Sequence, residues 1–162
     1  METLSRRFFD TTAGDLMSKT VIAISEEMSV KGAAHLLAQD RISGAPVVNA
    51  RGRCVGVFST TDFVSWADRE NRDVRRGRWD RPGAHSAWQV LDADTTGADR
   101  VGQQMSPKPV TARPDTPIGE LARMMTELHI HRIIVVDAEE RPIGVVSSTD
   151  ILAAVARAAE KQ

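Results

Sequence analysis

The feature that most constrains this chain is an internal repeat. When the sequence is slid against itself by 88 residues, residues 17–64 align with residues 105–152 without a gap, and 13 of the 48 aligned pairs are identical. Other pairs keep apolar character, such as Val55 with Ile143. Agreement over this length indicates two copies of one supersecondary unit, named copy one and copy two below. Since one unit of this size is too small to cover both faces of its own sheet, the copies are expected to pack on each other.

Each copy has the pattern of a βαββα unit. An apolar run, residues 21–24 or 109–112, precedes a helical stripe; in copy two Thr116 is the expected cap and Pro117 the first helical residue. Two β-branched runs joined by a polar turn then predict a hairpin, and a second helix begins near Thr61 or Thr149. These runs are residues 46–48 with 54–58, and residues 133–136 with 143–146. The predicted fold class is α+β, with two βαββα repeats packed as a pseudo-twofold pair around a cleft.

Composition narrows the class of protein. Apolar residues make up 41% and charged residues 27% of the chain, which is typical of soluble globular domains. The net charge of −1 provides no overall attraction to nucleic acid or to an anionic membrane. No apolar run approaches the roughly 18 residues of a membrane span, and the polar N-terminus lacks the pattern of a secretion signal. A single cysteine, Cys54, cannot form an internal disulfide, so we expect a cytoplasmic protein without a membrane partner.

One motif occurs in both copies where the last strand meets the last helix. It reads G-h-h-S-x-x-D, where h is apolar, at residues 56–62 and 144–150. A serine at such a junction offers a hydroxyl beside free helical N–H groups, a combination that suits an anion or a ligand hydroxyl. Asp62 and Asp150 are placed to accept two hydrogen bonds from the vicinal hydroxyls of a ribose. The alternative is that both are ordinary carboxylates of a helix N-terminus.

A basic pair occurs in copy two only. Residues 131–137 read His-Arg-Ile-Ile-Val-Val-Asp, so His131 and Arg132 precede a predicted buried strand. The planar fork of an arginine suits phosphate oxygens. Copy one has Ser43 and Gly44 at the matching positions, so its site keeps the ribose acceptor and lacks these cations. The alternative for the basic pair is a solvent-exposed strand start.

Taken together, these segments resemble the CBS domain, named after cystathionine β-synthase, which usually occurs in pairs. The resemblance covers residues 13–68 and 100–156, and residues 131–137 are similar to a segment in the nucleotide-binding γ subunit of AMP-activated kinase. It implies a nucleotide in the cleft, with the adenine between the first strand of one copy and the second strand of the other. The residues implied for the main site are Ser147, Thr149, Asp150, His131, Arg132, Thr20, Val21, Ile42, Ser43 and Ala45. Those implied for a weaker second site are Ser59, Thr61, Asp62, Thr111 and Ile130.

The resemblance also implies a domain organisation and a function. The chain divides into an N-terminal extension (1–12), CBS repeat one (13–68), a partly ordered linker (69–99) and CBS repeat two (100–162). The expected function is regulatory: the module binds AMP, ADP or ATP, and less favourably S-adenosylmethionine, and signals through an unidentified effector protein or a homodimer. Since the sequence has no catalytic constellation and no zinc-ligand spacing, we expect neither an enzyme nor a metal site.

Two other functions compete with this prediction. In the first, the module is purely structural: it forms a homodimer through a helix face of small apolar residues, Leu152, Ala153, Ala154 and Ala158, and binds no ligand. In the second and weaker one, the arginine-rich linker binds nucleic acid, although its arginines alternate with acidic residues that neutralise them. We expect the early linker to extend a helix that breaks at residues 81–83, and Trp66 to contact the linker.

Overall fold

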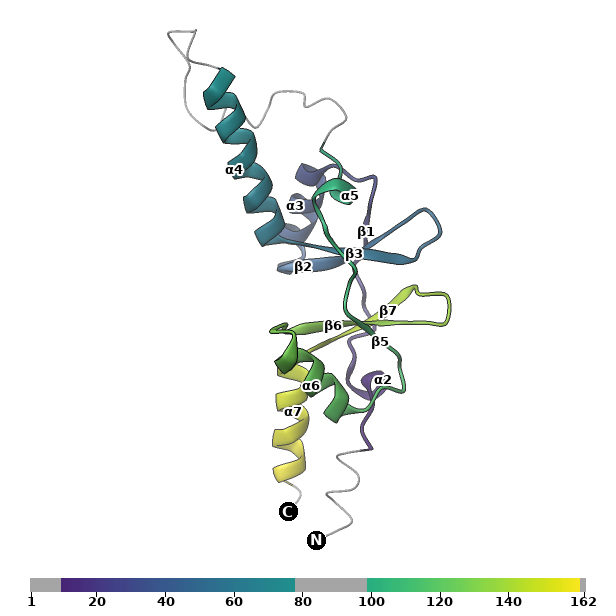
Figure 1. Ribbon diagram of the computed structural model, residues 1–162. Coiled ribbons are helices and arrows are strands. Elements are labelled where there is room, and N and C mark those ends of the chain that lie inside the picture. Colours follow the sequence, from purple (N-terminus) through teal and green to yellow (C-terminus); the bar gives the residue numbers. More distant parts are fainter. Residues whose placement is uncertain (1–9, 78–98, 161–162) are drawn as a thin grey trace.

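The computed structural model describes residues 10–77 and 99–160, which form two stacked α+β halves. Their sheets face each other, and the larger helices lie on the outer sides (Figure 1). None of the helices in the described ranges combines the length and the hydropathy that a membrane crossing requires. In chain order the elements are α2 (Ala13–Leu16), β1 (Ile24–Ser25), α3 (Val30–Gln39), β2 (Gly44–Val48), β3 (Cys54–Ser59), α4 (Thr60–Gly77), α5 (Val101–Gln104), β4 (Ser106–Pro107), β5 (Thr111–Ala112), α6 (Ile118–Glu127), β6 (Arg132–Val136), β7 (Pro142–Ser147) and α7 (Ser148–Ala159).

The two sheets have the same register, and the predicted βαββα units are confirmed. In each half an antiparallel hairpin, β2–β3 or β6–β7, carries a short parallel strand on one side, β1 or β5. Gly44 pairs with Ser59, and 88 residues further on Arg132 pairs with Ser147. Both ladders shift register at the last pair before the turn. The 88-residue repeat of the sequence is therefore a repeat of the backbone, down to its irregularities.

The two copies exchange their first segments, which the pattern of the repeat does not predict. Helix α2 of copy one lies in the lower half of Figure 1, and helix α5 of copy two lies in the upper half. Ala13 is fully buried in the lower core and Val101 in the upper core. Strand β4 of copy two pairs with β3, and a single bridge likewise joins Ser18 to Val145. Each packed half thus takes its leading segment from the other copy.

The motif glycines are required where the exchanged segments cross the strands. A side-chain carbon built on Gly56 would lie 2.4 Å from the sulfur of Met105 and 2.8 Å from the carbonyl oxygen of Ser106. One built on Gly144 would lie 2.3 Å from the sulfur of Met17. Any larger residue forces a shift of the crossing segment, which explains why the G-h-h-S-x-x-D motif begins with glycine in both copies.

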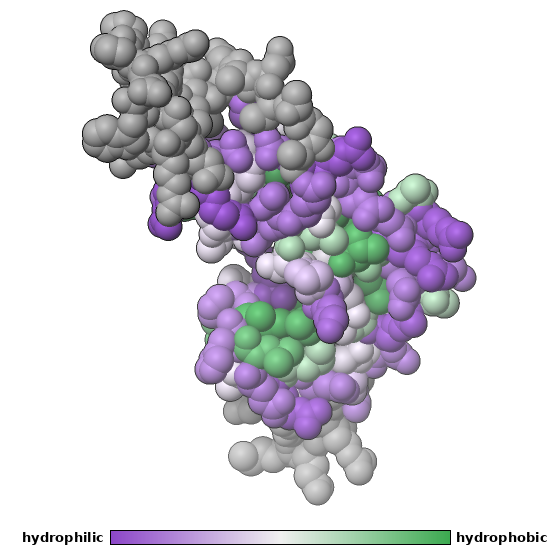
Figure 2. Space-filling model, turned by 45° about the horizontal axis from the view of Figure 1, so that its top comes forward, coloured by the Kyte–Doolittle hydropathy of each residue, from purple (hydrophilic) through white to green (hydrophobic). Residues whose placement is uncertain are grey.

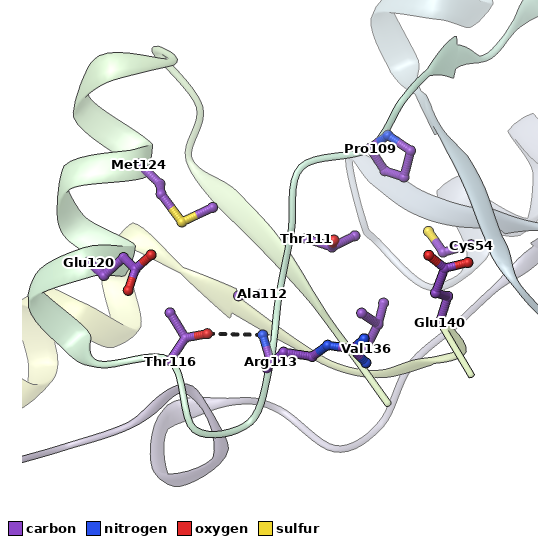
Figure 3. A pocket seen from close by; sticks show the side chains of 10 residues that line it. All are labelled: Cys54, Pro109, Thr111, Ala112, Arg113, Thr116, Glu120, Met124, Val136 and Glu140. Carbon is purple, nitrogen blue, oxygen red and sulfur yellow. Dashed lines mark hydrogen bonds between the residues drawn. The ribbon is translucent and has the colours of Figure 1, made fainter. Parts of the chain in front are cut away.

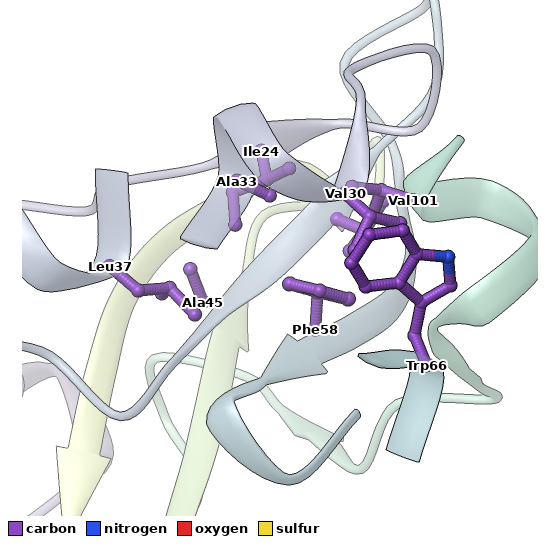
Figure 4. Close-up of a cluster of buried hydrophobic side chains, with 9 residues drawn as sticks. Ile24, Val30, Ala33, Leu37, Ala45, Phe58, Trp66 and Val101 are labelled. Carbon is purple, nitrogen blue, oxygen red and sulfur yellow. The ribbon is translucent and has the colours of Figure 1, made fainter. Parts of the chain in front are cut away.

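The upper core contains the larger side chains. Trp66 is only 3% exposed and packs beside Phe58 in a cluster drawn in Figure 4. Its indole Nε1 donates to Oδ1 of Asp99 over 3.0 Å. Because Asp99 is the last linker residue, it makes the contact that was expected between Trp66 and the linker. The matching position in copy two is Ala154, so the lower core is built from smaller groups.

Two details of the helices differ from or extend the sequence prediction. The prediction that Thr116 caps α6 is wrong: Pro117 is the cap residue, and the Thr116 hydroxyl instead accepts from the Arg113 N–H over 3.0 Å. The Thr116 hydroxyl therefore stabilises the turn before α6 instead of capping the helix. Helix α4 does extend into the early linker, as predicted. The expected break at residues 81–83 and most of the N-terminal extension lie outside the described residues.

Candidate functional site

A cavity of about 490 Å³, named the cleft cavity, lies between the two sheets. Figure 2 shows apolar residues gathered on the lower half beside the hollow between the halves. Copy one contributes the start of β2 and the end of β3 to its wall, and copy two contributes β4, the segment that follows it, and the start of β6. The wall residues are Ser43, Gly44, Ala45, Pro46, Val57, Ser59, Ser106, Pro107, Lys108, Pro109, Val110, Ile130, His131, Arg132, Ile134 and Val145.

The serine and aspartate of the motif form the same helix cap in both copies. Oδ2 of Asp150 accepts from the N–H and the hydroxyl of Ser147 over 2.7 and 2.6 Å, and Oδ2 of Asp62 accepts from Ser59 over 2.8 and 2.6 Å. The second carboxylate oxygen differs. Oδ1 of Asp62 accepts from the Ser106 hydroxyl over a long 3.3 Å, whereas Oδ1 of Asp150 has no partner among the described residues. Helix capping therefore occupies Oδ2 of each aspartate and leaves Oδ1 with a long contact in Asp62 and with no partner among the described residues in Asp150.

Three basic side chains border the cleft cavity. His131 and Arg132 are exposed at the start of β6, as expected, and Arg132 lies opposite Ser147 in the ladder. Lys108, which the sequence reasoning missed, is exposed on the segment after β4 and has a backbone φ of 59°. Its counterpart Thr20 was named, so the 88-residue offset was the signal that could have found it. A polyanion in this cavity would meet positive charge from two segments.

The cleft cavity unites residues from both predicted sites. From the main set it contains His131, Arg132, Ser43 and Ala45, and from the weaker set Ser59 and Ile130. The cause is the exchange of segments, because residues 106–110 run past Ser59 on their way from the upper to the lower sheet. Asp62 stands behind the wall, bonded to Ser59 and Ser106. The predicted residues outside this wall are Thr20, Val21, Ile42, Ser147, Thr149, Asp150, Thr61, Asp62 and Thr111.

The described part of the chain contains no cluster of side chains suited to a metal ion. Within residues 10–77 and 99–160, no group of three or more His, Cys, Asp or Glu side chains is close enough to hold a metal ion. Every buried side-chain nitrogen and oxygen there has a hydrogen-bond partner. The lining of the cleft cavity combines serine hydroxyls, apolar walls and basic side chains, which suits recognition of a ligand.

The pairing of two such units around a shared cleft agrees with comparisons with known proteins. The family described as CBS domain matches residues 13–69 and 98–157. The chain belongs to the CBS domain family. Its relatives include protein MJ1426 of Methanocaldococcus jannaschii, 28% identical over 87% of this chain and 89% of that protein. The chloroplastic protein CBSX2 of Arabidopsis thaliana is 28% identical over 88% of this chain and 63% of its own length.

Solved structures of other CBS pairs have the same architecture. CBSX2 in complex with AMP matches with a TM-score of 0.69 at 25% identity, over 93% of this chain and 98% of that chain. The cytosolic domain of the Mg²⁺ channel MgtE in complex with ATP matches with a TM-score of 0.65 at 27% identity, over 94% of this chain and 51% of that chain. The predicted CBS pair and its α+β fold are therefore confirmed.

Proposed function

We propose that this CBS pair is a regulatory rather than a catalytic module, which binds an adenine nucleotide between its sheets and transmits the bound state to a partner. The observation that carries the proposal is the composition of the cleft cavity. Ser59, backed by Asp62, lines the same cavity as Lys108, His131 and Arg132. An acceptor for ribose hydroxyls and cations for phosphate oxygens thus face one cavity with apolar walls.

The nucleotide has two candidate orientations, related by the pseudo-twofold axis. In the first, Asp62 accepts from the ribose, the adenine lies against the apolar walls, and the basic side chains meet the phosphates. In the second, predicted from the sequence, Asp150 is the ribose acceptor, its Oδ1 is unpaired within the described residues, and Arg132 lies opposite Ser147. The cavity supports the first orientation, and the unpaired oxygen supports the second.

The ligand class follows from the charges of the site. AMP, ADP and ATP present phosphate oxygens to the basic side chains, whereas S-adenosylmethionine carries no phosphate and would leave them unpaired. The AMP complex of CBSX2 and the ATP complex of the MgtE domain support an adenine nucleotide. We therefore propose AMP, ADP or ATP as the ligand. A single cysteine supports a reducing compartment such as the cytoplasm.

Calorimetric titration with AMP, ADP, ATP and S-adenosylmethionine tests the function. We expect one adenine nucleotide to bind, and at a hundredfold excess over its dissociation constant to add about 2.7 kcal/mol to the stability. Asp62→Ala and Asp150→Ala then identify the ribose acceptor, with Asp40→Ala, an exposed residue after α3, as the matched control. Affinity is compared rather than melting temperature, because each motif aspartate also caps its helix.

Each outcome of that titration has a clear meaning. Loss of affinity in Asp62→Ala alone assigns the first orientation, and loss in Asp150→Ala alone assigns the second. Full affinity in both variants would refute the ribose role of the motif. No binding of any adenosine compound would refute the sensor function and leave assembly as the remaining function of the module.

We also propose that the signalling form is a homodimer held by the outer helices. Val64 on α4 and Leu152 on α7 occupy matching positions and are 63% and 67% exposed, and Val155, one turn after Leu152 on α7, and Leu128 at the end of α6 are exposed as well. Apolar side chains of this size on an outer helix face favour a protein contact. Sedimentation should give a dimer for the parent chain and a monomer for Leu152→Glu. A monomeric parent chain would exclude this surface as a self-contact.

Nucleic-acid binding has less support. Arg69 donates to Oε1 of Gln104 over 2.6 Å, and Arg72 forms an ion pair with Asp68 at 2.6 Å. These contacts occupy basic groups that a phosphate backbone would need. We therefore propose that the partner is a protein, either the second copy or an effector.

A further inference from the structure

The two hairpin turns of the molecule meet at one end of the cleft. The turn of copy one is residues 49–53 and that of copy two is residues 137–141, and Figure 1 shows both on the right, one above the other. The Cys54 N–H donates to the carbonyl oxygen of Glu140 over 2.9 Å, and Figure 3 shows these two residues next to each other. Nη1 of Arg53 lies 3.8 Å from Oε2 of Glu140. We name these two interactions the hairpin contact.

The hairpin contact is one-sided, because the matching contact from the other copy cannot form. The counterpart of Cys54 is Pro142, which has no N–H to donate. The counterpart of Glu140 is Gly52, which has no carboxylate to offer to Arg141. The Arg141 guanidinium pairs with carboxylates of its own turn instead. The pseudo-twofold symmetry of the module is therefore broken at the point where the turns meet.

Glu140 has a backbone conformation that the turn alone does not explain. Its φ is 63°, in the left-handed region, and the matching residue of copy one, Gly52, has a φ of 75°. Glycine adopts this region without strain, whereas a residue with a side chain is strained there. A glycine at position 140 would form the same turn without strain, but it could not pair with Arg53. The glutamate is therefore explained by its contact with the other copy.

The cleft cavity lies toward the opposite end of the same strands. Its wall includes Gly44 and Arg132, the first residues of β2 and β6, whereas the hairpin contact follows the last residues of these strands. Four residue steps of about 3.3 Å separate the two ends, a distance of about 13 Å. The segments that connect the halves, residues 19–23 and 108–110, belong to no helix or strand. They tie the halves together without fixing the angle between them.

We propose that the hairpin contact is the pivot about which the cleft opens and closes. Rotation of the halves about it moves the strand starts that line the cleft cavity and keeps the turns together. A rotation of about 15°, as in other rigid-body transitions, moves the far end by about 3 Å over this length. A ligand in the cavity would thereby change the angle between the outer helices. That last step rests on the proposed nucleotide function, whereas the pivot itself does not.

Distances between two spin labels on the outer helices test the pivot. The labels are attached to cysteines that replace Gln39 and Glu127, which are exposed at matching positions in the last turns of α3 and α6 and lie outside the cleft cavity. The native Cys54 is replaced by serine, which keeps the N–H of the hairpin contact, or by proline, which removes it. Dilution with unlabelled chain restricts the measurement to distances within one molecule.

Without ligand, Cys54→Pro should broaden the distribution of label distances by about 3 Å or more relative to Cys54→Ser. Arg53→Ala in the serine background should broaden it less, because only an exposed ion pair is lost. Arg51→Ala, which changes an exposed arginine of the same turn outside the hairpin contact, should leave it unchanged. Copy two has Pro142 at the matching place in a hairpin of the same register, so we expect Cys54→Pro to fold.

Equal distributions in Cys54→Ser and Cys54→Pro would overturn the pivot. Should the proline variant fail to fold, equal distributions in Cys54→Ser with and without Arg53→Ala would overturn it instead. Both comparisons are made without nucleotide, so they decide on the pivot whether or not the nucleotide function holds. Calorimetry with AMP, ADP and ATP on the Cys54→Ser chain tests that function separately.

Discussion

Copy one places Trp66 where copy two has Ala154, and copy two places His131 and Arg132 where copy one has Ser43 and Gly44. Around these differences the backbones match: both hairpins have the same register and the same irregularity before the turn. At the motif glycines and at the Ser–Asp helix caps the copies agree because the backbone leaves little choice. Trp66 faces a core, and His131 and Arg132 face the cleft cavity.

This comparison separates two kinds of constraint. Gly56 and Gly144 are identical because a segment crosses each of them within van der Waals contact. Ser59 with Asp62 and Ser147 with Asp150 are identical because each pair caps a helix. Side chains that line a core or the cleft cavity are free of these demands, so they could diverge, and we place the individual functions of the copies there.

The largest expected effect concerns Trp66, the large core side chain that copy one has and copy two lacks. Trp66→Ala should lower the free energy of unfolding by about 3–5 kcal/mol, because a large buried side chain is removed. Arg123→Ala, at an exposed position in copy two, should change it by less than about 0.5 kcal/mol. Urea denaturation measures both. Equal effects would mean that the upper core does not depend on the tryptophan.

The next effect concerns the crossings, where the copies should behave alike. Gly56→Ala and Gly144→Ala should each cost about 1–3 kcal/mol of stability, since the new carbon collides with the crossing segment. A double-mutant cycle sharpens the comparison. Met17→Gly should relieve Gly144→Ala more than Met105→Gly relieves Gly56→Ala, because the three atoms nearest the carbon added at 144 all belong to the Met17 side chain, whereas the Ser106 carbonyl still lies 2.8 Å from the carbon added at 56. Equal relief would show that the backbone of β4 shifts as easily as a methionine side chain to make room for the added carbon.

A smaller effect is expected where the linker ends on copy one. Asp99→Ala removes the acceptor of the Trp66 indole and should cost about 1 kcal/mol. In a Trp66→Phe background, which has no indole N–H, the same substitution should cost almost nothing. Chemical denaturation of the two single variants and the double variant checks this. Additive losses would show that Asp99 stabilises the chain by another route.

The smallest effect is a difference in acid sensitivity between the two hairpin turns. The Arg141 N–H, followed by its guanidinium, lowers the pKa of Asp137, while copy one uses the neutral Asn49 to accept from the same two backbone positions. The pKa of the Asp137 carboxyl is lower in the folded chain than in the unfolded chain. The ionised carboxylate therefore stabilises the folded chain fully at pH values above the unfolded pKa, near 4, and this stabilisation is lost as the pH falls from there through the lower, folded pKa.

Asp137→Asn should therefore flatten the dependence of the melting temperature on pH below about pH 4. The reverse exchange in copy one, Asn49→Asp, introduces a carboxylate and should make the melting temperature depend more steeply on pH in the same range. Thermal unfolding measured at intervals between neutral and acidic pH gives both slopes. Identical slopes for the parent chain and Asp137→Asn would exclude this carboxylate as a source of acid sensitivity.

Much of the fold could be predicted from local patterns. The hairpins were predicted from β-branched runs and polar turns, and helix α4 was correctly extended into the linker. His131, Arg132, Ser43 and Ala45 were named and do line the cleft cavity. These features depend on neighbours in the sequence or on the 88-residue offset, which the chain displays directly.

The exchange of leading segments could not be predicted in this way. Residues before the first strand carry only a short apolar pattern, and both halves offer a glycine-bearing strand for them to cross. Which half receives Ala13 or Val101 depends on the path of the chain through the whole molecule. That path decides that Lys108 borders the cleft cavity beside Ser59.

The sequence by itself thus determined the two βαββα units and supplied candidate residues for a nucleotide site. Only the tertiary structure decided which of those residues share a cavity, because cavity walls are formed by segments far apart in the chain. A second cavity, of about 360 Å³, illustrates the same point. Its lining residues stand far apart in the sequence, and they share one space only because β5, α6 and a hairpin of the same copy surround it, with Cys54 of the other copy at its edge.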